Sequence, residues 1–325
     1  MKSGIAIAAL VLAASAPLRA QTISPFDVFV FQDFTLMNTE VNGRIAIGGD
    51  ATFTNWRVGH MLAPGYTDYG LVVGQDLTSR DGSVAQGRTY VGGVLDAVNT
   101  GFPAAYPPEV GGPSVVDFAA ESARLTSLSD GYAAMGANGS TQLVNGELNF
   151  IGNSNYNIFS ISMALLQQGT AGYEFVTPFG STSIINVLGS STNSAFNNTA
   201  FYFNCTAVAT SSSCQSGTNE NTPAGAARTL WNFNDQTDIV FGGPVHGSIL
   251  APNADAEFGV GDVVGTVVVK SGTANSEFYS NHDYSGELPI TATPEPATFG
   301  LLALGLGVIA LGAMRRRRLQ PSKAV

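Results

Sequence analysis

The sequence has few charged residues, and fewer of them are basic than acidic. Asp, Glu, Lys and Arg make up 12% of the 325 residues, about half the usual share of roughly 25%. Acidic residues outnumber basic ones by 24 to 14, which gives a net charge of −10. Partners such as nucleic acid or an anionic membrane surface need a basic patch, so this balance argues against both. Because hydrophobic residues reach 44%, the low charge indicates a folded chain rather than a disordered one.

Residues that bind metals or act as nucleophiles are also scarce. The three histidines, His60, His246 and His282, have no metal-ligand spacing, so no zinc site is predicted. The chain lacks a Gly-x-Ser-x-Gly nucleophile elbow, a Cys–His pair at a recognisable spacing and a phosphate-binding loop. Its only cysteines, Cys205 and Cys214, lie close together. In an oxidising compartment such a pair predicts a structural disulfide.

The N-terminal segment, 1–20, has the three parts of a secretory signal peptide. Lys2 supplies the positive n-region, residues 5–14 form the apolar core, and Leu18-Arg19-Ala20 gives a cleavage site. We expect cleavage between Ala20 and Gln21, and therefore an exported chain.

The C-terminal residues combine a short motif, an apolar run and a basic cluster. Pro294, Glu295 and Pro296 are followed by an uncharged run that spans 297–313. The basic cluster after it comprises Arg315, Arg316, Arg317 and Arg318. The run just meets the lower limit, roughly 17–25 residues, for a helix that crosses a hydrocarbon core. We expect a transmembrane helix over about 297–314, with the arginines on the cytoplasmic side.

This order of motif, helix and arginines resembles the PEP-CTERM sorting signal, which occupies 291–325 here. Such tails occur on exported proteins of Gram-negative bacteria that also make exopolysaccharide. The resemblance implies that an exosortase, a membrane transpeptidase, cuts near the motif and releases or re-anchors the protein. The alternative is an ordinary single-pass anchor, which needs no Pro-Glu-Pro motif. Loss of both ends would leave seven basic and 23 acidic residues, a net charge of −16.

The body of the chain, 21–290, contains a strand–glycine–strand pattern that recurs. The first copy of this pattern is Ala46-Ile47-Gly48-Gly49-Asp50. Similar stretches follow at 72–76 and, after a shorter step, at 90–94. The stretch 245–250 is followed by 263–269, at the same spacing as this shorter step. Units that recur in this way are typical of the rungs of a β-solenoid, and the longer step predicts a rung with an insertion. An irregular β-sandwich is the alternative.

One segment interrupts the strand pattern with helical spacing. Apolar residues recur every three or four positions across 114–131, which predicts an amphipathic helix with Ser114 and Asp117 as a capping box and Gly131 as its stop. We expect this helix to pack along the outside of the solenoid. Further strands are predicted at 142–150, 156–161, 173–176 and 183–188. The stretch 193–222, rich in Asn, Ser and Thr, predicts a long surface excursion.

Together these features resemble the choice-of-anchor A family of bacterial surface proteins. The resemblance is carried by Phe29–Phe34 with Val41–Ala51, and by Leu230–Asp235 with Gly247–Ala254, Gly265–Lys270 and Gly286–Pro289. It implies an adhesive protein with a right-handed β-solenoid, similar to ice-binding and adhesin solenoids, flanked by a helix. The family joins one such body to different attachment tails, of which PEP-CTERM is one. It brings no catalytic residues with it.

Extracellular β-solenoids also include polysaccharide lyases and hydrolases, so an enzyme is the alternative. Glycoside hydrolysis needs two carboxyl groups roughly 5–10 Å apart. Asp255 and Glu257 would share one face of a strand, with Asp235 and Asp238 nearby in sequence. On an acidic exported surface we interpret these residues as solvated charges, so no catalytic residue is predicted. Asn253, Asp255 and Glu257 could also offer oxygen ligands to calcium, a hypothesis beside the prediction of no metal and no cofactor.

Ice binding is a further alternative for a solenoid, and it needs a regular row of threonines. The candidates Thr52, Thr54, Thr78, Thr89 and Thr266 are scattered along the chain. We therefore expect a mainly β, non-catalytic protein of the cell surface or extracellular matrix. Its expected role is that of an adhesin or an exopolysaccharide-associated biofilm protein, sorted by an exosortase, with glycans as partners and no nucleic acid.

Overall fold

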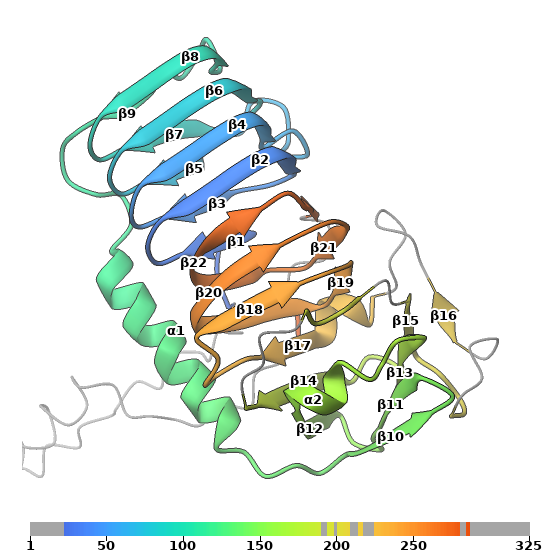
Figure 1. The fold of residues 1–325 in the computed structure, drawn as a ribbon. Coiled ribbons are helices and arrows are strands. Elements are labelled where there is room, and N and C mark those ends of the chain that lie inside the picture. Colours follow the sequence, from blue (N-terminus) through green and yellow to red (C-terminus); the bar gives the residue numbers. More distant parts are fainter. Residues whose placement is uncertain are drawn as a thin grey trace, which may run out of the picture. The chain divides into compact units, whose positions relative to one another are not determined.

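The computed structural model describes residues 23–189, 194–197, 200–208, 214–216, 224–279 and 284–286. The chain divides after Leu288 into two units, and every described residue belongs to the first. Its larger sheet has 18 strands, whose parallel pairings wind the chain into a nearly closed solenoid (Figure 1). Among the described residues one long helix, α1 (Phe118–Ala133), runs along the outside of the stack (Figure 1).

The first part of the solenoid, which we call the N-terminal coil, is formed by residues 23–113. Its strands are β1 (Val28–Val30), β2 (Phe34–Val41), β3 (Ile45–Ile47), β4 (Ala51–Val58), β5 (Tyr69–Val73), β6 (Leu77–Val84), β7 (Arg88–Val91), β8 (Leu95–Gly101) and β9 (Glu109–Val110). Each strand pairs in parallel with the next but one. Each turn of the chain therefore lays a new rung on the previous one.

The repeat found in the sequence corresponds to the rungs. Ile47 pairs with Val73, which is the longer step, and Val73 pairs with Val91, which is the shorter one. The longer step arises because the loop 59–68 lies between β4 and β5. The solenoid prediction is confirmed, and the sandwich alternative is wrong.

The second part, which we call the C-terminal coil, returns to the start of the first. Its strands are β12 (Tyr156–Ser162), β14 (Thr182–Leu188), β17 (Thr229–Asn232), β18 (Asp238–Phe241), β19 (Val245–His246), β20 (Ser248–Phe258), β21 (Asp262–Val264), β22 (Val267–Ala274) and β23 (Glu277–Tyr279). Val245 pairs with Val263, as the spacing of the repeat predicts. β22 pairs in parallel with β1, so the two coils form one stack with the chain's first rung in its interior.

A smaller sheet lies beside the β12 end of the stack (Figure 1). It contains β10 (Ser140–Val144), β11 (Glu147–Ile151), β13 (Gly172–Val176), β15 (Ala200–Phe203) and β16 (Gln215–Ser216), and the short helix α2 (Met163–Leu166) lies near it. The single strand predicted at 142–150 is wrong. Asn145 and Gly146 adopt positive φ, 52° and 84°, and this Asn-Gly turn folds the segment into a hairpin.

The prediction of a surface excursion at 193–222 is also wrong in part. Phe196, Phe201 and Phe203 are at most 3% exposed, and β15 adds to the smaller sheet through β13. The aromatic run Phe201-Tyr202-Phe203, whose burial alternates along β15, is the strand signal that the surrounding polar residues obscured. Cys205 and Cys214 are joined by a disulfide in this segment.

Helix α1 covers one side of the stack, as expected, but its bounds differ from the prediction. It begins at Phe118 because the Asp117 carboxylate accepts the N–H of Ala120 at 3.0 Å, which makes Asp117 alone the N-cap. Ser114 instead bonds Val116, and Gly131 lies inside the helix. The strands beneath α1 are apolar on both faces, as parallel strands covered on both sides are. Their outward side chains include Leu230, Leu250 and Val268, all fully buried.

None of the described helices is both long and apolar enough to cross a bilayer. The expected signal peptide with its cut at Ala20 and Gln21, the motif 294–296, the helix 297–314 and the arginines 315–318 lie outside the described residues.

Candidate binding surfaces of the solenoid

Outward side chains of consecutive rungs stand in columns. Thr273 is in register with Thr35, Thr35 with Thr52, and Thr52 with Thr78. Four threonines therefore align on neighbouring strands, about 4.8 Å apart. The description of Thr52 and Thr78 as scattered is wrong, because the sequence between them makes up one long rung. Thr35 and Thr273 were missed, although Thr35 precedes Thr52 by a single rung.

The other threonine candidates lie elsewhere. Thr89 and Thr266 are buried, and Thr54 stands in the next column with Met37 and Arg80. Of the five threonines named from the sequence, only Thr52 and Thr78 therefore belong to the surface column.

A column of aspartates runs beside the threonines. The carboxylate Oδ1 of Asp33 accepts the N–H of Asp50 at 2.8 Å, that of Asp50 accepts the N–H of Asp76 at 3.0 Å, and that of Asp76 accepts the N–H of Val94 at 2.7 Å. Each carboxylate thus caps the backbone of the next rung. A Cβ atom at Gly49 or Gly93 would collide with the capping carboxylate, Asp33 or Asp76, whereas the equivalent position of the rung between them is Gln75. We call the threonine and aspartate columns together the ladder face.

The ladder face ends at a corner where the backbone turns. The corner residues all have φ between 51° and 54°: Asn38, Asn55, Asp81 and Asn99. Asn and Asp tolerate this left-handed conformation better than other non-glycine residues. Their side chains also bond between rungs, from Asn55 to Asn38 at 3.1 Å and from Asn99 to Asp81 at 2.6 Å. The corner therefore fixes the edge of the ladder face.

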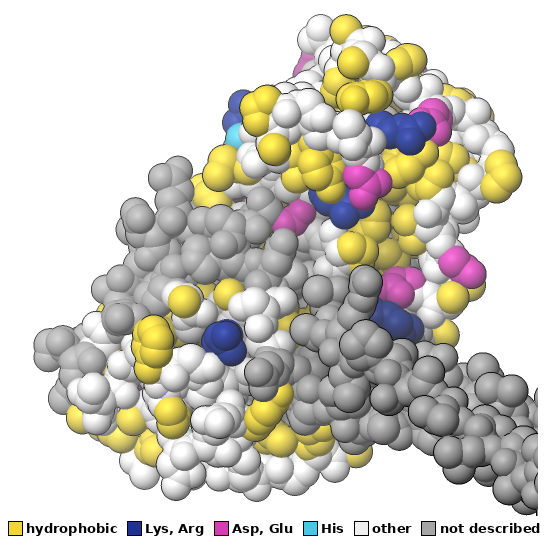
Figure 2. Space-filling model, turned by 180° about the vertical axis from the view of Figure 1, so that it is seen from behind, with side chains coloured by type: hydrophobic (Ala, Val, Ile, Leu, Met, Phe, Trp, Pro, Cys, Tyr) yellow, Lys and Arg dark blue, Asp and Glu magenta, His cyan; other side chains and the backbone are white. Residues whose placement is uncertain are grey.

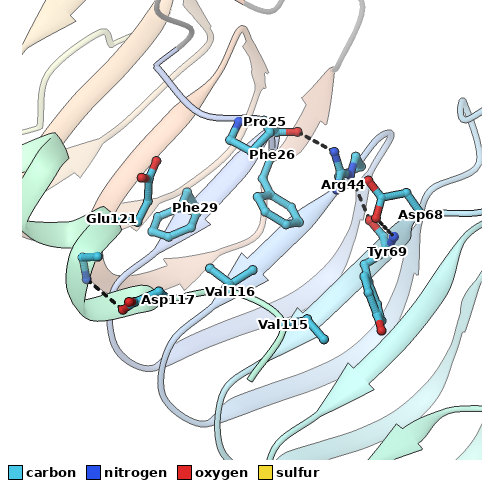
Figure 3. Close-up of a pocket in the computed structure, with 11 residues that line it drawn as sticks. Pro25, Phe26, Phe29, Arg44, Asp68, Tyr69, Val115, Val116, Asp117 and Glu121 are labelled. Atoms are coloured by element: carbon cyan, nitrogen blue, oxygen red, sulfur yellow. Dashed lines mark hydrogen bonds and ion pairs between the residues drawn. The ribbon is translucent and has the colours of Figure 1, made fainter. Parts of the chain in front are cut away.

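A groove of about 480 Å³ lies where the start of α1 meets the N-terminal coil (Figure 3). Phe26, Phe29 and Val116 form its apolar wall. Arg44 lies opposite, donating to the carbonyl oxygens of Tyr69 at 2.9 Å and Pro25 at 3.1 Å. The guanidinium also pairs with Asp68 at 3.0 Å and sits 4.5 Å from the Phe26 ring centroid. These contacts hold the arginine in place.

A second polar cluster borders the groove. The Tyr69 hydroxyl donates to Glu109 at 2.9 Å, and Arg88 pairs with Glu109 while lying 4.8 Å from the Tyr69 ring centroid. Burial, and then the hydrogen bond to Glu109, raise the pKa of the Tyr69 phenol. The phenol is therefore a neutral donor at ordinary pH.

The acidic residues considered for catalysis or calcium binding are solvent-exposed and lie outside this groove. Asp255 and Glu257 point outward from β20, and Asp238 is in register with Asp255 on the next strand. Glu257 is in register with Thr273 and so extends the threonine column. Asp235 accepts the N–H of Gly189 at 3.4 Å. Asn253 donates to the carbonyl oxygen of Asn234 at 2.7 Å, which directs its amide toward the backbone.

The described histidines occupy different surroundings. His246 is buried and stacks on Phe201, with ring centroids 4.9 Å apart. Nδ1 of His60 lies 3.4 Å from Glu40, and burial followed by the charge of Arg57 lowers its pKa. His282 lies outside the described residues.

Within the described part of the chain, one group of three acidic, histidine or cysteine side chains is close enough to share a metal ion. It consists of Glu174, Cys205 and Cys214. Its two sulfur atoms are bonded to each other, and thiolates rather than disulfide sulfurs are the ligands that metals take. This group therefore does not fit a metal site.

Comparison with known proteins adds two matches, one in each part of the chain. Residues 19–280 match the family described as "Putative Ice-binding-like adhesive domain", and residues 292–318 match the PEP-CTERM protein-sorting motif. The comparison with curated proteins gives no match. An adhesive domain followed by this sorting motif indicates an exported, cell-surface protein. The chain belongs to the ice-binding-like adhesive domain family and carries a PEP-CTERM sorting motif.

Proposed function

We propose that this chain is a non-catalytic adhesin of the choice-of-anchor A type, which binds polysaccharide of the cell surface or extracellular matrix through the ladder face. The observation that carries the proposal is the alignment of Thr273, Thr35, Thr52 and Thr78 beside the aspartate column. Hydroxyl groups both donate and accept, and carboxylates accept. A row of such groups at strand spacing suits the hydroxyls of an extended neutral glycan, because many weak contacts on one polymer add to a useful avidity.

The sorting motif suggests how the adhesin reaches the surface. After removal of residues 1–20, the helix at 297–314 would hold the precursor in the inner membrane until an exosortase cuts near Pro294-Glu295-Pro296. Replacing these three residues by alanine should leave a longer product in the membrane fraction. A product of unchanged size and location would refute exosortase processing. We also infer that the coils wind right-handed, since parallel crossover connections almost always do.

Polymer binding can be measured with the form Gln21–Thr293, which contains all the described residues. It is mixed with exopolysaccharide from the producing strain, and the polymer's mass is followed by size exclusion with light scattering. We expect the mass to rise, with protein co-eluting. Thr52→Arg, in the middle of the threonine column, should abolish the rise. Ser127→Arg, on the exposed side of α1, is the matched control and should not. No change in mass with the unmodified protein would contradict the proposal.

The alternative function, an extracellular carbohydrate-active enzyme, gives the opposite result in the same experiment. The polymer's mass would fall with time, and Asp255→Asn or Glu257→Gln would stop the fall. The exposure of both carboxylates favours the adhesin, because the acid of a glycosidic pair is typically held in an apolar pocket beside the scissile bond.

Ice binding is a second candidate, favoured by the same threonine column. It predicts thermal hysteresis and shaped ice crystals with purified Gln21–Thr293, and loss of both in Thr52→Arg but not in Ser127→Arg. Freezing without hysteresis or crystal shaping would remove this candidate and leave polysaccharide as the ligand.

A further inference from the structure

The two ends of the solenoid differ in whether their last strand is covered. At the β12 end, the N–H groups of Asn138 and Gly139 both donate to the carbonyl oxygen of Ile158 at 3.0 Å. The Asn138 side chain accepts the N–H of Ile158 at 2.7 Å. At the opposite end, β8 pairs with β6 and β9 with β7, and no further described strand pairs with either (Figure 1). We call these the capped end and the open end.

The backbone groups of β8 that face away from β6 can be identified. The carbonyl oxygen of Val94 accepts the N–H of Leu77 at 2.9 Å, and that of Asp96 accepts from the Arg80 guanidinium at 3.0 Å. Both residues therefore face β6. Because alternate residues of a strand direct their polar groups to opposite sides, Leu95 and Ala97 present N–H and C=O groups to the free side. An unpaired edge of this kind is a template for another strand.

The side-chain columns also change character at the open end. The aspartate column ends in Val94, which is 64% exposed, and the column of Met37, Thr54 and Arg80 ends in Val98, 54% exposed. Val110 of β9 is 53% exposed. Figure 2 shows hydrophobic side chains at this end of the molecule. Three exposed valines therefore lie on or beside the two terminal strands, β8 and β9.

Charge at the open end is balanced. Asp96 pairs with Arg80 at 2.6 Å, and Glu109 pairs with Arg88. The acids of β8 and β9 are thus each neutralised by an arginine of the preceding turn. Two copies of this acidic chain would repel through most of their surfaces, whereas at the open end the acids of these two pairs are matched by arginines. This balance makes a second copy of the chain the partner that fits.

We propose that the open ends of two copies associate, with the edge of β8 in one copy pairing antiparallel with the edge of β8 in the other. The contact is isologous and closes as a dimer. The capped end offers no matching edge, so the same contact does not extend into a filament. One rung is a small contact area, and small interfaces give weak association. The fraction of the chain that is dimeric therefore rises with protein concentration. This inference is independent of what the ladder face binds.

Sedimentation velocity of Gln21–Thr293 over a concentration series tests the dimer. Two variants block the edge in different ways. Ala97→Pro removes an N–H on the free side and leaves the bonds to β6 in place. Val98→Lys places a charge at the edge. Each should raise the dimer dissociation constant about ten-fold or more, with an unchanged far-UV circular dichroism spectrum. Val260→Lys changes an equally exposed valine, 62%, in the turn between β20 and β21, and should behave as the unmodified chain.

A cross-link then identifies the surface. Val98→Cys should give a covalent dimer with a short bis-maleimide, and Val260→Cys should not. A chain that stays monomeric at every concentration would overturn the proposal. So would a dimer that neither edge variant weakens, or one that cross-links through position 260 and not through position 98.

Discussion

The two coils share parallel stacking but differ in what holds their rungs together. In the N-terminal coil, hydrogen bonds between identical positions of successive rungs repeat along the stack, as in Asp33, Asp50 and Asp76. The C-terminal coil has one short ladder of this kind, in which Ser248 caps Thr266 and Thr266 caps Tyr284, but most of its core contacts occur once. Trp231 lies within 6.3 Å, centroid to centroid, of five aromatic rings: those of Phe150, Tyr173, Phe175, Phe196 and Phe201.

A buried polar network adds to this difference. The Asn232 amide donates to the carbonyl oxygen of Ser129 at 3.0 Å and to Asn186 at 2.9 Å, and it accepts the Ser129 hydroxyl at 2.6 Å. Asn186 in turn donates to the carbonyl oxygen of Tyr132 at 2.7 Å. These bonds fasten α1 to the C-terminal coil. The N-terminal coil is therefore stabilised mainly by contacts that repeat between neighbouring rungs, and the C-terminal coil mainly by core contacts that occur once. Single substitutions should lower the free energy of unfolding by different amounts in the two coils.

Trp231→Ala should have the largest effect. It removes a fully buried side chain from the centre of the aromatic cluster, and such truncations cost about 3–5 kcal/mol. Chemical denaturation of the two chains measures the loss. Trp56→Ala in the N-terminal coil is the matched control. Trp56 packs against one aromatic ring, that of Phe53, and donates a hydrogen bond to Ser79, so its truncation should cost less than that of Trp231. Equal costs at the two tryptophans would contradict the comparison.

Asn232→Ala should rank second. The change leaves the Ser129 hydroxyl and carbonyl and the Asn186 oxygen buried without this partner, and unsatisfied buried groups cost about 1–3 kcal/mol each. We expect a loss of about 2–3 kcal/mol in denaturation, with faster hydrogen exchange in α1. Asn234→Ala should cost well under half as much, because this side chain bonds Asp130 nearer the surface and makes only a longer contact, 3.3 Å, with the Ser129 hydroxyl. Unchanged exchange in α1 would show that the network does not fasten the helix.

Alkaline pH should weaken the C-terminal coil by a smaller amount. Burial raises the pKa of Tyr132 and Tyr284 above the ordinary value of 10, and the described residues give neither hydroxyl a hydrogen-bond partner. The folded chain keeps these protons when the unfolded chain has lost them. Their stabilising contribution is therefore complete below pH 10 and falls as pH rises above 10, by about 1.4 kcal/mol per pH unit for each proton.

The two tryptophans allow the alkaline effect to be located. In Trp56→Phe, the fluorescence of Trp231 reports the C-terminal coil alone. The free energy of unfolding should be lower at pH 11 than at pH 9. Tyr132→Phe should reduce this difference in free energy by about 1 kcal/mol. The same pH difference in Tyr132→Phe and the unmodified chain would indicate that other groups govern the alkaline loss.

The difference between the two coils also explains which parts of the fold could be predicted from the sequence. The steps from Ile47 to Val73 and from Val73 to Val91 are visible because each of these residues is followed by a glycine, and the first two also by a capping aspartate. The smaller sheet was not predicted, since its strands combine residues as distant as Leu148 and Phe201 through contacts that occur once. The threonine column was overlooked for another reason. A column depends on register between strands, and register is settled only when the insertion at 59–68 has been assigned to a loop.

The groove at the start of α1 shows the same limit. Arg44 lies just before the first copy of the repeat, but its partners Pro25 and Asp68 come from the residues before β1 and from the insertion at 59–68. No spacing rule joins these three positions. Local patterns therefore predicted the rungs and the helix, whereas the candidate surfaces between rungs required the fold.

Asp50→Ala should have the smallest effect, about 1 kcal/mol, because it removes one exposed cap from the N–H of Asp76. Asp50→Asn keeps an acceptor and should cost less. In a stack held by neighbours alone, stability is close to a sum of rung and interface contributions. Asp33→Ala and Asp76→Ala cap interfaces two rungs apart, so their costs in a double variant should add within about 0.5 kcal/mol. A larger cost in the double variant would mean that the aspartate column acts as one unit, and the N-terminal coil would then resemble the C-terminal coil more than its repeats indicate.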